Sequence, residues 1–65
     1  MQIQVGCVYL DKTNAEITIV GCVSSADITG EDIYIGAVKG SQLLRKYWPD
    51  GKSTGKWPDL CRKYR

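Results

Sequence analysis

The sequence predicts a β-rich α+β fold, in which a three-stranded antiparallel meander is followed by a short-helical C-terminal third. Two observations lead to this class. Residues 1–38 carry strand patterns separated by turn residues, and residues 39–65 combine a helix-capping signal with proline and glycine breaks. A small, partly open barrel is a variant of the same architecture. The 65 residues allow one small domain, spanning 1–65.

The three strands follow from two kinds of pattern. Apolar and other residues alternate with a period of two over residues 3–10, which predicts the first strand. Residues 16–24 and 32–38 are rich in β-branched side chains and predict the second and third strands. Residues 24–30 supply the break between them. Both faces of each strand are apolar near the middle, so we expect a strongly bent or covered sheet.

The first turn is predicted over residues 11–15, where Asn14 can take a positive φ. If the turn is centred between Asn14 and Ala15, Cys7 lies opposite Cys22 on the hairpin. A shift of the turn by half a residue removes that pairing.

The C-terminal third carries local helix signals. Ser41 is placed to cap a helix over residues 42–47, which Pro49 ends. Pro58 can occupy the first turn of a second short helix, with Asp59 favourable at its positive end.

Charge is strongly segregated along the chain. Residues 1–38 hold one lysine and five acids, a net charge of −4, whereas residues 39–65 hold eight basic residues and two acids, a net charge of +6. Aromatic residues are interleaved with the basic ones in the second segment. Basic groups neutralise phosphates and aromatic rings stack on bases, so this segment is a candidate nucleic-acid site. Its candidate residues are Arg45, Lys46, Trp48, Lys52, Lys56, Trp57, Arg62, Lys63 and Arg65.

A structural alternative exists for the same residues. Trp48 and Trp57 each precede a proline and would equally serve to dock the tail onto the sheet, since aromatic side chains are usually buried in small domains. Lys52 and Lys56 equally suit a solvated, glycine-rich turn.

Residues 48–60 contain Trp-Pro-Asp twice around that turn, and two catalytic motifs are excluded there. Gly51-Lys52-Ser53 looks like the end of a phosphate-binding P-loop, but the earlier glycine of that motif is replaced by Lys46. Trp-Pro-Asp is also the acid-loop signature of tyrosine phosphatases, whose nucleophilic cysteine follows a histidine and precedes an arginine by six residues. Here Cys61 is followed at once by Arg62, and the chain has no histidine.

The composition points away from catalysis and metal binding. Without histidine, a general base near neutral pH would need a strongly shifted Asp, Glu or Lys. The three cysteines form no Cys-x-x-Cys pair and are expected to be buried, reduced thiols. We therefore expect no enzyme activity, no metal and no cofactor. No apolar run approaches the roughly 18 residues of a membrane span, so we expect no membrane partner. The stretches that end at Cys7 and Cys22 resemble lipoprotein signals but lack the basic and apolar regions of a secretory signal, so we expect a cytoplasmic protein.

A family resemblance enters at three stretches. Val5-Gly6-x-Val8-Tyr9-x-Asp11, then Ile17-Thr18-Ile19-Val20-Gly21 and a late Leu-Leu-x-x-Tyr resemble the small Src-homology-3-like barrels of phage and mobile-element accessory proteins. The resemblance covers about residues 3–48 and implies a binding module rather than an enzyme. Such domains usually have a fourth or fifth strand, which no pattern after residue 38 predicts.

Two functions are compatible with these patterns. The first is a small nucleic-acid-binding accessory protein that uses the basic, aromatic-rich segment. The alternative is a protein–protein interaction module, such as a phage-type inhibitor or adaptor with an acidic protein partner. The acidic and basic segments would also allow a head-to-tail homo-oligomer.

Overall fold

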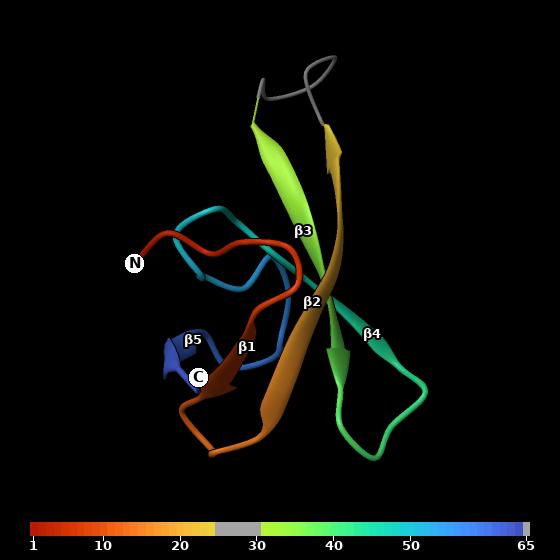
Figure 1. Ribbon diagram of the computed structural model, residues 1–65, viewed down its shortest axis with the longest axis vertical. Coiled ribbons are helices and arrows are strands. Elements are labelled where there is room, and N and C mark those ends of the chain that lie inside the picture. The colour runs from red at the N-terminus through yellow and green to blue at the C-terminus, as the bar shows by residue number, and fades with distance from the viewer. Residues whose placement is uncertain (25–30, 65) are drawn as a thin grey trace.

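The computed structural model describes residues 1–24 and 31–64, which form a five-stranded antiparallel sheet (Figure 1). Its strands are β1 (Val8–Asp11), β2 (Glu16–Ser24), β3 (Asp32–Val38), β4 (Leu44–Tyr47) and β5 (Leu60–Lys63), in the order β4-β3-β2-β1-β5. The described residues contain no helix, and hence none long and apolar enough to cross a membrane. The fold is therefore all-β, and the predicted α+β class with a short-helical C-terminal third is wrong.

The second and third predicted strands have the bounds of β2 and β3. The predicted break between them falls mostly on residues 25–30, outside the described residues. The first strand is shorter than predicted and begins at Val8. Before it the chain turns at Gly6, whose φ of 91° is a conformation that other residues rarely adopt. Ile3, at the start of the predicted strand, is nevertheless fully buried, and its N–H donates to the Pro49 carbonyl.

The first hairpin has a different register from the one that would pair two cysteines. Asn14 has the expected positive φ, 65°. However, Val8 lies opposite Thr18, so the turn is centred nearer the N-terminus than Asn14–Ala15. The carbonyl of Cys7 accepts from Ile19, and Cys22 lies opposite Tyr34 on β3. All three cysteines are free, but Cys22 and Cys61 are exposed, so the predicted burial is wrong for these two.

Strand β4 occupies the residues of the first predicted helix. Ser41 caps a turn, not a helix: its N–H donates to Val38 and its hydroxyl accepts from the N–H of Leu43. The chain thereby reverses, and β4 pairs along β3 from Leu44 to Tyr47. A helix of two turns is marginal without packing. The ladder with β3 and the complete burial of Tyr47 favour the strand.

Strand β5 replaces the second predicted helix. Pro58 and Asp59 precede the strand, and the N–H of Leu60 donates to the Gly51 carbonyl. From Leu60 to Lys63 the chain pairs with β1. The C-terminal third of the chain thus supplies both edges of the sheet: β5 lies at one edge and β4 at the other.

The sheet curls around a small core, visible in Figure 1 as the crossing of β4 behind β2 and β3. Register irregularities at Ile19/Gly21 and Leu10/Asp11 contribute to the bend. The concave side buries side chains from β1, β2, β4 and β5 together with the N-terminal segment; they are Ile3, Tyr9, Ile17, Ile19, Tyr47 and Leu60. β4 and β5 do not pair with each other, so the sheet stays open and is not a closed barrel.

Gly36 permits the closest packing on this concave side. A Cβ atom at Gly36 would lie 2.5 Å from Cγ2 of Ile17 and 3.0 Å from Cε2 of Tyr47. We expect Gly36→Ala to lower the free energy of unfolding by about 1–3 kcal/mol, because the added methyl group overpacks the core. Gly21→Ala is the matched control, since a Cβ there meets nothing within 4 Å. Urea denaturation measures both, and equal effects of the two substitutions would contradict this account of the core.

Candidate binding site at the edge of strand β4

The first Trp-Pro-Asp segment forms a tight turn after β4. The N–H of Gly51 donates to the Trp48 carbonyl at 2.9 Å, and the N–H of Trp48 donates to the Lys52 carbonyl at 2.8 Å. Gly51 has a φ of 92°, and a Cβ there would lie 2.8 Å from Cε of Met1. The Asp50 carboxylate accepts from the N–H of Lys52. This segment is therefore a structural turn, and no phosphate loop is formed.

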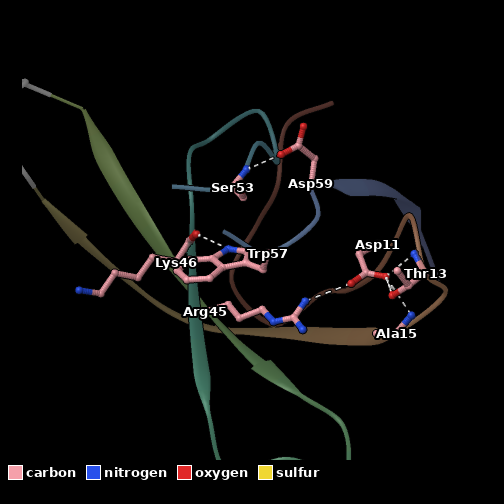
Figure 2. Close-up of polar contacts among 8 residues, drawn as sticks. All are labelled: Asp11, Thr13, Ala15, Arg45, Lys46, Ser53, Trp57 and Asp59. Carbon is pink, nitrogen blue, oxygen red and sulfur yellow. Dashed lines mark hydrogen bonds and ion pairs between the residues drawn. The ribbon is translucent and has the colours of Figure 1, made fainter. Parts of the chain in front are cut away.

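The second Trp-Pro-Asp segment fastens the following loop onto β4 (Figure 2). The indole Nε1–H of Trp57 donates to the Lys46 carbonyl at 3.0 Å, and the N–H of Thr54 donates to the same oxygen at 3.2 Å. Asp59 accepts from the N–H of Ser53 at 2.8 Å. Trp57 therefore has the docking role that the structural alternative predicts.

The Trp57 ring itself is held from two sides. Its edge-to-face contact with Tyr47 has a centroid distance of 6.4 Å. It also lies directly over Gly55, where a Cβ would come within 2.7 Å of the ring. Trp57 remains only half-buried, so part of the ring is still accessible.

A groove of about 460 Å³ lies beside this ring. It is lined by two leucines, Trp57, a proline and two cations: Leu43, Leu44, Arg45, Lys56, Trp57 and Pro58. Leu43 and Leu44 are 76% and 61% exposed, which is high for adjacent leucines. Successive residues of a strand point to opposite faces, so Leu44 and Arg45 flank β4 on both sides. The groove therefore opens along the edge of the sheet.

The structure divides the predicted nucleic-acid site. It brings Arg45, Lys56 and Trp57 together at the groove. Lys46 is exposed on the opposite face of β4 from Arg45, and Lys52 is exposed in the turn where Trp48 is half-buried. The remaining members are Arg62 and Lys63, exposed on β5 at the other edge of the sheet, and Arg65, which lies outside the described residues.

Sequence reasoning missed the apolar lining of the groove. Leu43 and Leu44 were expected on the inward face of a helix, and Pro58 at a helix start. The signal that could have identified them is the alternation from Leu44 to Tyr47, which in a strand directs Leu44 outward when Tyr47 is inward.

The segregated charges fold against each other. Among the residues that the structure describes, both ion pairs join a cation after residue 38 to an acid before it. Nη1 of Arg45 lies 3.1 Å from Oδ2 of Asp11, and Nζ of Lys39 lies 3.6 Å from Oε2 of Glu16. In the folded chain, Lys39 and Arg45 thus offset two of the acidic charges of residues 1–38.

Asp11 is the buried centre of these contacts (Figure 2). Its Oδ1 accepts from the N–H and the hydroxyl of Thr13 at 2.7 and 2.6 Å and from the N–H of Ala15 at 3.0 Å. Its Oδ2 accepts from Arg45. Burial alone raises the pKa of Asp11, but the hydrogen bonds from Thr13, Ala15 and Arg45 outweigh it, so the pKa lies below its ordinary value.

Two other titratable groups adjoin this network. A hydrogen bond from the N–H of Ser53 lowers the pKa of Asp59, despite some desolvation, and the cations Lys12 and Lys52 add to the effect. Burial raises the pKa of Tyr47, although the charge of Arg45 opposes the shift. The Tyr47 hydroxyl is buried without a hydrogen-bond partner in the described part of the chain.

No group of three or more metal-binding side chains gathers within residues 1–24 and 31–64.

We expect Asp11→Asn to lower the free energy of unfolding by about 2–4 kcal/mol at neutral pH, because Arg45 loses its buried partner. The folded pKa lies below the ordinary 3.8, so the charged carboxylate stabilises the fold above that pH. This stabilisation is lost as the pH falls through the folded pKa, and Asp11→Asn removes that part of the acid dependence. Lys39→Ala, which breaks the exposed pair, should cost at most about 0.5 kcal/mol. Chemical denaturation as a function of pH measures the free energies of unfolding of the unmodified protein and of both variants. Similar losses of stability in the two variants would contradict the central role of the buried Asp11–Arg45 pair.

No family model, no curated protein and no solved structure matches this chain. The groove at the edge of β4 and the exposed cations are therefore the grounds on which its function is inferred.

Proposed function

We propose that the protein is a small interaction module that binds a peptide segment of a partner protein in the groove beside β4. The observation that carries the proposal is the pair of exposed leucines, Leu43 and Leu44, next to the fixed ring of Trp57. Exposed apolar side chains gathered around an aromatic residue in a groove are typical of binding surfaces. A volume of about 460 Å³ is enough for a few side chains of a partner.

The charges of the groove select the partner. Lys56 and Arg45 line it, and no acidic residue does. Arg45 is already neutralised by Asp11, whereas Lys56 has no acidic partner among the residues described. A peptide with apolar side chains and at least one carboxylate would complement this surface.

Strands β4 and β5 also support a binding module. The resemblance to small Src-homology-3-like barrels implied such a module, but the sequence pattern predicted neither the fourth nor the fifth strand that those domains usually have. The two additional strands agree with the strand number of those domains, although the sheet here is open. An accessory role in a phage or mobile element, a cytoplasmic location and homo-oligomer formation all stay predictions.

A selection from a library of short random peptides tests the proposal. We expect enriched peptides to combine apolar and acidic residues, and Leu43→Ser to weaken their binding about tenfold, because the leucine loses its apolar contact with the ligand. Val23→Ser is the matched control, since Val23 is also exposed but lies on β2 and does not line the groove. Isothermal titration calorimetry measures the affinities. Equal weakening by both substitutions, or the absence of any enriched peptide, would refute the proposal.

Nucleic-acid binding is the second candidate, favoured by one specific observation. Lys46, Lys52, Lys56, Arg62 and Lys63 are all exposed and, within the part of the chain described, have no acidic partner. They are spread over a turn and both edges of the sheet, and of these five only Lys56 lines the groove with Trp57. The apolar groove therefore ranks above them.

Tryptophan fluorescence distinguishes the two candidates. Because a peptide site is favoured, we expect no change in emission when single-stranded DNA, double-stranded DNA or RNA is titrated at low or moderate salt. A quench that weakens steeply with salt and is reduced by Lys56→Gln would instead establish the nucleic-acid function. Lys12→Gln controls for the loss of one positive charge away from the groove lining.

A further inference from the structure

We infer that the peptide in the groove adds a further strand to the sheet by pairing with the open edge of β4 at Leu44. This inference rests on the proposed function and specifies how the partner is held. Strand addition to an exposed edge uses main-chain hydrogen bonds for affinity and alternate side chains for specificity. Three features of β4 support it: the direction of its backbone groups, the limited cover of its edge, and the position of the groove.

The direction of the backbone groups follows from the neighbouring ladder. In antiparallel pairs, successive residues direct their N–H and C=O groups alternately to opposite sides. The N–H of Lys39 donates to Glu16 next to β2, so Ala37, two residues earlier, also faces β2 and Gly36 faces β4. Gly36 lies opposite Arg45, whose backbone groups therefore face β3.

The backbone N–H and C=O of Leu44 must then point away from β3. The same holds for Lys46, two residues later. A second observation agrees, since the Lys46 carbonyl accepts from Thr54 and Trp57, both in the loop outside the sheet. Leu44 thus presents one donor and one acceptor at the edge.

The loop covers only the C-terminal half of this edge. Ser53 forms an isolated bridge with Tyr47, and Thr54 and Trp57 occupy the Lys46 carbonyl. The N–H and C=O of Leu44 have no partner in residues 1–24 and 31–64. Edge strands are usually protected by charged side chains. β5 carries Arg62 and Lys63 at its exposed end. On β4 the two basic residues do not protect the edge at Leu44, because Arg45 is paired with Asp11 and Lys46 lies where the loop covers the strand. The exposed side chain at the uncovered start of β4 is Leu44.

The groove lies where the added strand would run. Its lining includes Leu44 and Arg45, which point to opposite faces of β4, so it follows the edge of the strand. Trp57 closes it at the point where the loop begins to cover β4. A strand about 4.8 Å from β4 would place one side chain against the leucines and a carboxylate near Lys56. The inferred ligand is an extended segment in which apolar residues alternate with others, at least one of them acidic.

The test compares Leu44→Pro with Leu44→Ala, using the full chain and a peptide from the library selection. Both substitutions remove the leucine side chain, but only proline removes the N–H. Leu44 is exposed and its N–H lies outside the ladder, so an edge position tolerates proline. We expect Leu44→Pro to bind about tenfold more weakly than Leu44→Ala, because one main-chain hydrogen bond is lost. Equal affinities of the two folded variants would overturn strand addition.

A second measurement uses the unmodified protein and covers the case in which Leu44→Pro does not fold. Hydrogen exchange followed by NMR should show the Leu44 amide protected only in the complex, and N-methylation of the peptide at alternate positions should abolish binding. A peptide that binds without either effect would refute strand addition and leave the proposed function standing. If no peptide binds, both fail. A dimer of the free protein that Leu44→Pro dissociates would show that a second copy occupies the edge and would overturn the choice of a partner peptide.

Discussion

The contact between Asp11 and Arg45 is the constraint on which the curvature of the sheet depends. The two residues belong to β1 and β4, which are separated in the sheet by β3 and β2, so they meet only if the sheet curls. A buried carboxylate is tolerable because Thr13, Ala15 and Arg45 supply donors to both of its oxygens. The Asp11 carboxylate thus closes the first turn through Thr13 and Ala15 and positions β4 through Arg45. In a chain of 65 residues, where hydrophobic burial is limited, such a contact has a large share in fixing the shape.

The curvature of the sheet determines how the edge of β4 is covered. Tyr47 is carried onto the concave side, where it packs in the core and meets the edge of Trp57. The loop between β4 and β5 must then cross next to β4, and it fastens there through the carbonyl of Lys46. That loop, residues 48–59, turns back at Gly51 and meets β4 at the Lys46 carbonyl, so it covers β4 only from Lys46 onward. The exposed groove is therefore a consequence of how the small core is completed.

The sequence was sufficient where local pattern and tertiary pairing agree. β2 and β3 have their predicted bounds, and Asn14 has its predicted conformation, because β-branched residues and a turn former act over a few positions. The sequence was insufficient to predict β4, because Leu43, Leu44 and Tyr47 suit a helical face as well as a strand. Pairing with β3 selects the strand, and that information is not local. The same reason explains the charges: Arg45 and Asp11 are 34 residues apart, so segregation along the chain did not reveal their contact. The groove was only half predictable, since its cations and Trp57 were identified and its leucines were not.

Trp57 shows how stability and binding share residues in so small a domain. Its indole N–H holds the Lys46 carbonyl, and its ring is fixed between Tyr47 and Gly55 before any ligand arrives. A binding wall that is already ordered loses little conformational entropy on association, so more of the contact energy contributes to affinity. The leucines differ in this respect, because they gain their apolar contacts only when the groove is filled. Binding energy should therefore come from the apolar contacts of Leu43 and Leu44 together with the main-chain hydrogen bonds at Leu44. Trp57 sets the position of the ligand along β4 and marks where its pairing with the sheet must end.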